Sequence, residues 1–327
     1  MDRRRFLLTS LAGGLVRPQA VPAQLPKAVL RIGYLRPGEG GWNSIDEALE
    51  QSLQELGWIK GRNLRFEIGN ASGRQDAMAG IARNVVQSGV DVLVVWGPPF
   101  AQAAGRVAPE IPLVFLGAFD PVAAGLVSNY ARPGGKVTGV TSVAGPEVFA
   151  KRLQLLKEAA PSVRRVLVLA ASEGTRTAGG TEQLAAAAKG MGVELDNVDI
   201  DTAAAAESVI RRAKDQGAHG LYVWPGGFVF SIVQQIADAA RANRLASVYP
   251  FREGALAGCL LSYAVDLVHV ARRGAVYVDK IFRGTPPGSL PIDQLSRYDF
   301  IINLKTAKAL GLTIPPSLLL RADQVIE

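Results

Sequence analysis

The segment VDVLVVWG, residues 90–97, is a nearly unbroken run of valine and leucine that ends on Trp96 and a glycine. Such a run is typical of a strand that is buried on both faces, as in the middle of a parallel sheet. On either side of it the sequence alternates between strand and helix patterns. Strand patterns occupy segments 28–35 (AVLRIGYL) and 111–118 (IPLVFLGA), and segment 44–57 (SIDEALEQSLQELG) has apolar residues at helical spacing. This alternation predicts a parallel sheet with helices on both faces.

The same pattern starts again in the second half of the chain. Segment 164–171 (RRVLVLAA) is an apolar strand that opens a second unit, which extends through segment 245–251 (LASVYPF). The sequence therefore predicts two similar α/β lobes with a boundary near residues 141–146. A helix over 266–284 and a strand followed by a helix over 297–311 come after the second unit. Both need a sheet to pack against, so we expect the chain to cross back between the lobes.

Two positions carry signals for the start of a helix. Ser44 is followed three residues later by Glu47, which predicts a capping box with Ser44 as the N-cap. Asp120 directly precedes Pro121, which predicts a helix with Asp120 as the N-cap and Pro121 at the first helical position. The alternative roles of Asp120 are those of a phosphate acceptor, a catalytic base and a ligand anchor. The sequence also allows Asp120 to cap the helix and contact a ligand at the same time.

Residues 1–23 have the pattern of an export signal. Arg3, Arg4 and Arg5 precede an apolar stretch over 6–16, and a small-residue cleavage site ends at Ala23. The apolar stretch is shorter than the roughly 20 residues that a membrane span needs. The paired arginines resemble a twin-arginine signal, with the general secretory route and a frayed amphipathic start as alternatives. We expect cleavage near Ala23 and a soluble periplasmic protein without a lipid anchor.

The composition argues against nucleic acid and metal as partners. The formal net charge is +7, and part of it comes from four arginines in residues 1–23. The remaining charges are scattered and not interleaved with aromatic residues. Cys259 is the only cysteine and has small or apolar neighbours, so we expect a buried, inert thiol. The two histidines, His219 and His269, are far apart in the sequence, so we expect no metal site and no cofactor.

The residues that follow the predicted strands are the candidates for a site, because ligands of open parallel sheets bind beyond the carboxyl ends of the strands. These positions are rich in proline, glycine and aromatic residues and poor in acid–base pairs, which suits binding more than catalysis. The sequence lacks a phosphate-binding P-loop and a G-x-S-x-G nucleophile motif. We expect no catalytic residues, and the candidate ligand-binding residues are Pro37, Trp96, Gly97, Pro98, Phe100, Phe119, Asp120, Thr141, Ser142, Glu173, Pro225, Phe251 and Tyr263.

Several of these residue types have more than one explanation. Trp96 is either a core or rim aromatic or a surface on which a ligand ring stacks. Glu173 is either a partner for a ligand ammonium group or a solvated loop carboxylate. Arg252, which lies next to Glu253, is either a partner for a ligand carboxylate or a structural residue that pairs within or between the lobes.

Long segments of the chain resemble a known family. RIGYLRPG (31–38), ARPGGKVTG (131–139) and INLKTAKALGLTIPPSLLLRADQVIE (302–327) are similar to ABC transporter substrate-binding proteins of the tryptophan/tyrosine-binding type, a branch of the type I periplasmic binding fold. The resemblance covers essentially all of residues 28–327. It implies two Rossmann-like α/β lobes with three inter-lobe crossovers and a ligand cleft between them. With the predicted boundary, lobe 1 is 24–142 plus 264–292, and lobe 2 is 143–263 plus 293–327.

The resemblance also implies a function. A protein of this family captures a small solute and delivers it to an ABC permease in the inner membrane, so we expect a monomeric binding protein and not an enzyme. Asp120, Thr141 and Ser142 would supply polar contacts, and Phe100 and Tyr263 would supply apolar walls. An exported ligand-sensing module for a membrane receptor is the alternative, and an enzyme that uses Asp120 or Glu173 is a third. A DNA-binding repressor is disfavoured because no helix pair for DNA precedes the first strand.

Three positions depart from the family pattern. Gly97 is followed by Pro98 and Pro99 where the family commonly has serine, threonine or a small residue, and Pro98 offers neither a hydroxyl nor an amide hydrogen. The segment AASEG (170–174) stands where Asn-Pro is common, and Ala264 stands where glycine is common. Anchors for an amino-acid head group are thus partly missing. The expected solute is amino-acid-like or an aromatic carboxylate.

Overall fold

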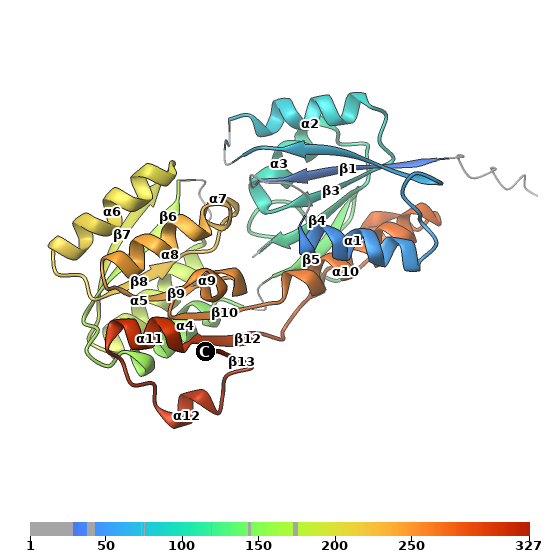
Figure 1. Ribbon diagram of the computed structural model, residues 1–327. Helices are drawn as coiled ribbons and strands as arrows, with labels where there is room; N and C mark the ends of the chain where they lie inside the picture. The colour runs from blue at the N-terminus through green and yellow to red at the C-terminus, as the bar shows by residue number, and fades with distance from the viewer. Residues whose placement is uncertain are drawn as a thin grey trace, which may run out of the picture.

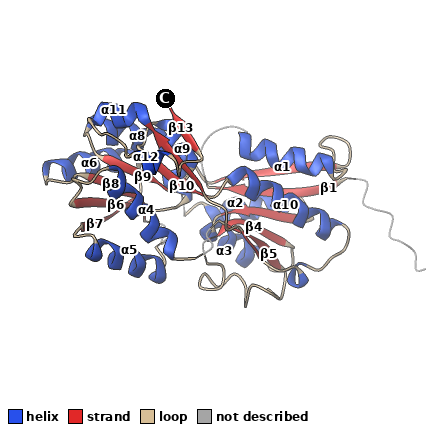
Figure 2. Ribbon diagram, turned by 90° about the horizontal axis from the view of Figure 1, so that it is seen from below, coloured by secondary structure: helices blue, strands red, loops and turns tan. Residues whose placement is uncertain are grey.

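The computed structural model describes residues 29–37, 43–72, 74, 76–118, 120–142, 145–172 and 176–327. Its strands form two separate sheets, each with helices on both faces (Figure 1). Figure 2, seen from below, shows the same two groups of strands with their helices lying side by side along the molecule. All strand pairs but one are parallel in the described part of the chain. The predicted α/β fold class is confirmed.

The first sheet is built around the segment VDVLVVWG. Strand β3 (Val92–Trp96) lies between β1 (Leu30–Arg36) and β4 (Leu113–Ala118), and the full order is β11-β5-β4-β3-β1-β2. The remaining strands of this sheet are β2 (Leu64–Asn70), β5 (Val137–Thr141) and β11 (Asp293–Gln294). Val92 to Val95 are almost fully buried, as expected for a strand covered on both faces.

Helices α1 (Ser44–Glu55) and α10 (Leu267–Phe282) cover one face of the first sheet. Helices α2 (Met78–Gln87) and α3 (Pro98–Val107) cover the other face. Helix α10 comes late in the sequence, yet it packs against α1 and β4. Its Gly274 lies so close to β4 that an added Cβ would be 2.6 Å from Cδ2 of Leu116. Helix α10 is therefore an integral part of the first sheet's core.

The second sheet has the order β13-β12-β10-β9-β8-β6-β7. Its strands are β6 (Arg165–Ala171), β7 (Glu194–Ile200), β8 (Gly220–Val223), β9 (Ala246–Tyr249), β10 (Leu261–Ala264), β12 (Asp299–Asn303) and β13 (Gln324–Ile326). One face packs against α6 (Ala203–Asp215), α7 (Gly227–Ser231) and α8 (Val233–Ala242). The other face packs against α4 (Glu147–Ala159), α5 (Ala178–Gly190), α11 (Leu304–Leu310) and α12 (Pro316–Leu319).

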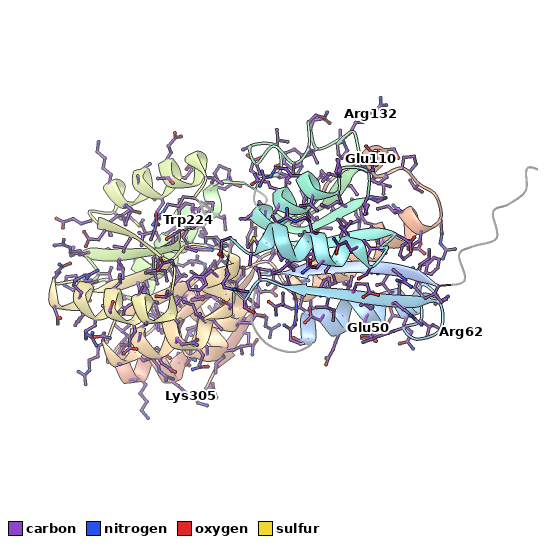
Figure 3. All side chains as sticks on the ribbon, turned by 90° about the horizontal axis from the view of Figure 1, so that it is seen from above. Glu50, Arg62, Glu110, Arg132, Trp224 and Lys305 are labelled. Carbon is purple, nitrogen blue, oxygen red and sulfur yellow. The ribbon has the colours of Figure 1, made fainter. Side chains whose placement is uncertain are left out.

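Aromatic side chains pack in the second core, together with the buried Arg152, whose Nε donates to the carbonyl oxygen of Tyr263 at 2.8 Å. Trp224 is fully buried and stacks on Phe149, with ring centroids 4.3 Å apart. Figure 3 shows Trp224 inside this half, with the labelled charged residues at the periphery of the molecule. Cys259 is buried as predicted, and burial raises the pKa of its thiol to about 12. The thiol therefore stays protonated at neutral pH and has low reactivity.

The chain passes between the sheets three times within the described residues. The passages follow β5, then β10, and finally β11, where the short helix η1 (Pro287–Ser289) leads into that last strand. We propose one lobe around each sheet, the first-sheet lobe and the second-sheet lobe. Asp293 pairs with Val140 of the first sheet, so the third passage would follow Gln294 and not residue 292. Helix α9 (Arg252–Ala257) contacts α8 and β10 in the second-sheet lobe.

Some predictions concern residues or features that the structure does not place at a site. The predicted export signal over 1–23 lies outside the described residues, as do Phe119 and Glu173. None of the described helices is both long and apolar enough to cross a membrane. The described residues also contain no cluster of three or more His, Cys, Asp or Glu side chains placed to hold a metal ion.

A buried hydroxyl connects the late segment to the first sheet. Thr138 of β5 is fully buried and donates a 2.9 Å hydrogen bond to the carbonyl oxygen of Leu290. The substitution Thr138→Val should lower the free energy of unfolding by about 1–3 kcal/mol, because it keeps the shape and leaves that carbonyl unsatisfied. Urea unfolding followed by circular dichroism measures the change. The exposed Thr181→Val is the control and should change stability by less than about 0.5 kcal/mol. Equal effects of the two substitutions would contradict the prediction.

Candidate functional site

A cavity of about 180 Å³ lies between the two lobes. Residues from both lobes line it, and most of the lining side chains are apolar or aromatic. Seven of the sequence-predicted residues are among them, namely Pro37, Trp96, Gly97, Pro98, Phe100, Ser142 and Phe251. The cavity lies where parallel strands of the first sheet end and the following helices begin, which is the usual place for a ligand in an open parallel sheet.

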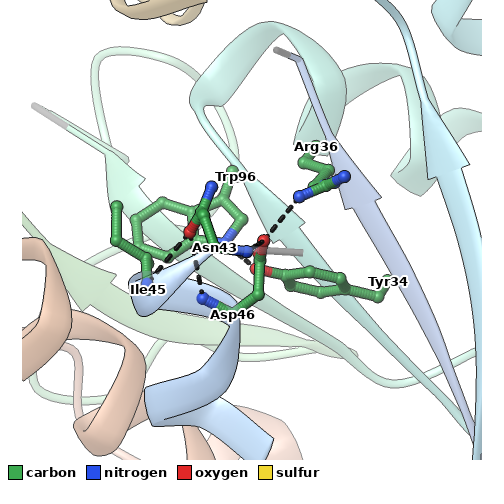
Figure 4. A network of polar contacts seen from close by, with 6 residues as sticks. All are labelled: Tyr34, Arg36, Asn43, Ile45, Asp46 and Trp96. Atoms are coloured by element: carbon green, nitrogen blue, oxygen red, sulfur yellow. Dashed lines mark hydrogen bonds and ion pairs between the residues drawn. The ribbon is translucent and has the colours of Figure 1, made fainter. Parts of the chain in front are cut away.

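A network of hydrogen bonds forms one wall of the cavity (Figure 4). The hydroxyl of Tyr34 donates a 2.6 Å hydrogen bond to Oδ1 of Asp46. Nη1 of Arg36 lies 2.5 Å from Oδ2 of the same carboxylate. Nε1 of Trp96 donates a 2.7 Å hydrogen bond to the Tyr34 hydroxyl oxygen. The network therefore joins β1, β3 and the first turn of α1.

The carboxylate of Asp46 is almost completely removed from water, with an exposed fraction of 2%. A buried charge is tolerated only when it is paired and hydrogen-bonded. Asp46 meets this condition, because it accepts from Tyr34, from Arg36 and from the backbone N–H of Asn43 at 3.0 Å. The network therefore fixes the position of the Arg36 guanidinium and of the Trp96 ring at the cavity.

Burial, followed by the negative charge of Asp46, raises the pKa of Tyr34 well above its usual value. The phenol therefore remains protonated at neutral pH and can act as a donor to Asp46 while it accepts from Trp96. This polarity explains why a tyrosine stands at this point of β1. A phenylalanine of the same shape would leave both partners without this hydrogen bond.

The start of α1 differs from the predicted one. Asn43, and not Ser44, is the N-cap, and its Oδ1 accepts from the backbone N–H groups of Ile45 at 2.9 Å and Asp46 at 3.3 Å. Asp46, and not Glu47, closes the capping box by accepting from the Asn43 N–H. Asn is as good an N-cap residue as Ser, and the one-residue shift places Asp46 at the third helical position, where its carboxylate meets Tyr34 and Arg36. The cap and the site network therefore share one carboxylate.

The start of α3 forms the opposite edge of the cavity. Gly97 is the N-cap with φ +79°, a conformation that favours glycine. Pro98 and Pro99 occupy the first two helical positions. Neither has an N–H, so Phe100 supplies the first backbone donor that this helix can offer. The start of α3 is therefore a poor binding place for an anion compared with an ordinary helix N-terminus.

The second-sheet lobe supplies an aromatic wall. Phe230 and Phe251 line the cavity, and their rings meet edge to face with centroids 5.1 Å apart. Gly227 at the start of α7 lies directly against Pro37 of the first-sheet lobe. A Cβ at this position would lie 2.4 Å from Cγ of Pro37. The two lobes therefore touch at Gly227, and only a glycine fits this contact without a shift.

Four other sequence-predicted residues do not line the cavity. Thr141 is buried, and its hydroxyl donates to the carbonyl oxygen of Asp293 at 3.3 Å. Pro225 is buried directly before Gly226, which does line the cavity. Tyr263 stacks on Tyr298 at 5.0 Å and borders a different groove, beside α4 and α5.

Asp120 is the fourth of these residues, and its predicted helix is absent. Oδ1 of Asp120 accepts from the backbone N–H groups of Val122 at 3.1 Å and Ala123 at 2.9 Å, as a capping residue does. The segment that follows is a turn and not a helix. Gly125 has φ +66°, and the N–H of Leu126 bonds back to the carbonyl oxygen of Pro121, which ends the turn. The capping role is correct, and the predicted helix is wrong.

Asn43, Asp46 and Phe230 were not considered from the sequence, and Arg36 belongs to the residues that follow the predicted strands but not to the list of candidate ligand-binding residues. Arg36 is the last residue of β1 and was within reach of the strand-end argument. Asn43 and Asp46 have the three-residue spacing of a capping box, which is visible in the sequence but competes with Ser44 and Glu47. Phe230 has no such signal, because its place at the cavity depends on how the two lobes meet.

Tyr34→Phe tests the network. At neutral pH the substitution should lower the free energy of unfolding by about 1–3 kcal/mol, because Asp46 loses a donor and Trp96 loses an acceptor. Above a pH of about 10 an unfolded tyrosine ionises, while the raised pKa keeps folded Tyr34 protonated. Ionisation of Tyr34 in the unfolded state therefore lowers the free energy of unfolding of the wild type as pH rises, and the variant, which has no hydroxyl at this position, lacks this decrease. The stability difference between the two proteins should shrink as pH rises above about 10. A difference that is constant in urea unfolding from neutral to alkaline pH would contradict this account.

Comparison with known proteins places the chain in a family. A model of the ABC transporter substrate binding protein family matches residues 40–326. The chain is 24% identical over 272 residues to the tyrosine-binding protein of Clostridioides difficile strain R20291, an alignment that covers 82% of this chain and 78% of the relative.

Solved structures with the same fold cover nearly the whole chain. A conserved domain protein from Vibrio cholerae is 27% identical with a TM-score of 0.84, and the match covers 91% of this chain and 99% of the other. A domain from Streptococcus pneumoniae in complex with L-Trp is 22% identical with a TM-score of 0.82, covering 91% and 100% of the two chains. The resemblance noted in the sequence is confirmed, and the chain belongs to the ABC transporter substrate-binding protein family.

Proposed function

We propose that this protein captures a small organic solute, either amino-acid-like or an aromatic carboxylate, and delivers it to an ABC importer in the inner membrane. The observation that carries the proposal is the cavity between the lobes, which has aromatic walls from both lobes and the Arg36–Asp46 pair at one side. Pockets for small molecules combine such apolar walls with a few fixed polar groups. The ligands named for two relatives, tyrosine and L-Trp, are of the same class.

Binding between two lobes would couple the solute to a change of shape. A ligand that touches both lobes favours the closed arrangement by the difference in its affinity for the closed and open states. The contact between Gly227 and Pro37 at the rim of the cavity supports this idea, because the lobes already meet there. A permease could then distinguish the loaded protein from the empty one.

We further propose that the protein binds its solute without transforming it. The described lining has no histidine or cysteine, and its hydroxyl groups are used within the fold. Ser142 donates to the carbonyl oxygen of Gly117 at 3.0 Å, and Ser231 donates to that of Phe228 at 2.7 Å. A nucleophile with an adjacent base, which covalent catalysis needs, is not formed by these groups. The proposal includes export to the periplasm as a monomer, with residues 1–23 as the removed signal.

A thermal-shift screen of the purified protein tests the binding function. Aromatic acids, aromatic amino acids and sugars form the panel. A solute at 100 times its dissociation constant should add about 2.7 kcal/mol to the free energy of unfolding. Gly227→Val should weaken binding, because its side chain would collide with the Pro37 ring where the two lobes touch; urea unfolding verifies that the variant is folded.

The Gly227→Val result depends on the closure mechanism, and the screen itself depends only on binding. If no member of the panel stabilises the protein, the proposed binding function is wrong. If a solute binds the variant and the wild type equally well, closure at Gly227 is wrong. Loss of uptake of the identified solute from cells that lack the protein, restored by the wild-type gene, separates delivery to an importer from binding alone.

A further inference from the structure

The three passages of the chain between the lobes come together at one place on the second-sheet lobe. Helix α4 begins at Glu147, just after the first passage. Strand β10 ends one residue after Tyr263, where the second passage begins, and Tyr298 lies in the third passage directly before β12. These three residues border the same groove on the surface of this lobe. The ends of all three passages are therefore neighbours, so contacts among them can position the linking segments.

Two contacts join these passages. Nε of Arg152, which belongs to α4, donates a 2.8 Å hydrogen bond to the carbonyl oxygen of Tyr263. The ring of Tyr263 stacks on the ring of Tyr298, with centroids 5.0 Å apart and an angle of 14° between the ring planes. Tyr263 therefore links the helix after the first passage, the strand before the second passage and the segment of the third.

The charge of Arg152 is buried without a carboxylate partner. The exposed fraction of this residue is 2%. Besides its bond to the Tyr263 carbonyl, the guanidinium donates to the hydroxyl oxygen of Tyr222 and lies over the ring of Phe149. No acidic side chain of the described residues lies within ion-pair distance of it, and Nη1 has no hydrogen-bond partner among them. A buried charge without an ionic partner lowers stability compared with apolar packing, so stability alone does not explain an arginine at this position.

The carbonyl that Arg152 holds is close to the first-sheet lobe along the chain. Two residues separate Tyr263 from Asp266. Asp266 caps α10 by accepting from the backbone N–H of Val268 at 2.9 Å, and α10 packs in the core of the first sheet. A movement of Tyr263 would therefore pass to the first-sheet lobe through a linker of only two residues. Hinges between closing domains consist of such short segments at the ends of helices and strands.

From these observations we infer that Arg152 is a positioning residue of the hinge, which restricts the opening of the two lobes by holding the Tyr263 carbonyl at the start of the second passage. Arg152 is not among the described residues that line the cavity, so it acts on the solute only through the arrangement of the lobes. The inference rests on the proposed function in one respect, that the lobes open and close. A looser hinge would populate the binding-competent arrangement less, and the apparent affinity would fall by that fraction.

Single-molecule Förster resonance energy transfer on the purified protein without any solute measures the arrangement of the lobes. Dyes at Ala123→Cys and Asp201→Cys, exposed positions that follow strands of different sheets, report the distance between the lobes. The native Cys259 is buried and should not take up dye. In this background Arg152→Met removes the guanidinium and keeps an apolar side chain. The variant should give a broader distribution of transfer efficiencies that is shifted to lower values, because the Tyr263 carbonyl is no longer held.

Lys151→Met is the matched control. Lys151 precedes Arg152 in α4 and borders the same groove, and its Nζ bonds within the helix, to Oε1 of Gln154 at 3.4 Å. This variant should keep the wild-type distribution. If Arg152→Met changes the distribution no more than Lys151→Met does, the inference is overturned. The proposed binding function is left intact in that case, because the distances are measured without a solute.

Urea unfolding separates the positioning role from a purely structural one. A purely structural Arg152 would lower the urea midpoint when it is replaced and would leave the distribution of the folded protein unchanged, and this result overturns the inference. If Arg152→Met does not fold, Arg152→Lys takes its place. Its ammonium group keeps the charge but lacks the rigid fork of a guanidinium, so the distribution should again be broader than that of the wild type. A wild-type distribution for the folded lysine variant in that case overturns the inference.

Discussion

The buried ion pair between Arg36 and Asp46 is the interaction on which the site depends. Its carboxylate also accepts from Tyr34 and from the N–H of Asn43, so one side chain ties the end of β1 to the start of α1. Through Tyr34 the same group orients Trp96 at the end of β3. A buried pair of this kind adds little net stability compared with apolar packing, but removing one partner is costly. Its main effect here is to fix the geometry of the cavity wall.

The fold explains why these residues meet. Parallel strands end at the same edge of a sheet, so residues that follow β1, β3 and β5 lie together although they are far apart in the sequence. The late segment completes the arrangement, because α10 packs on α1 and β11 pairs with β5 in the first sheet. The two lobes are therefore linked by several passages of the chain, which suits a hinge that opens and closes around a ligand.

Most of the fold could be predicted from the sequence, because long apolar strands and amphipathic helices have a clear period. The exceptions were short or depended on distant contacts. Strand β11 is only two residues long and carries no period, so no pattern in the sequence marks the third passage between the sheets, which we propose to follow Gln294. The turn after Asp120 has the residue types of a helix start, but Gly125 closes it after one turn. At the site, the sequence analysis found strand-end residues such as Trp96 and Ser142. It missed Asp46, which lies in the first turn of α1 and not at the end of a strand. Phe230 comes from the opposite lobe, and no local pattern predicts how two lobes face each other.

The central claim is that a solute bound between the lobes brings them together, and the distance between the lobes measures this directly. Spin labels at Arg62→Cys and Lys305→Cys, both exposed positions in different lobes, would report it by pulsed electron paramagnetic resonance (Figure 3). The native Cys259 is buried and should not take up label. The account predicts that a saturating solute shifts the distance distribution to a single narrower population, and that Gly227→Val in the same labelled protein suppresses the shift. An unchanged distribution at full occupancy of the wild-type cavity would contradict the account.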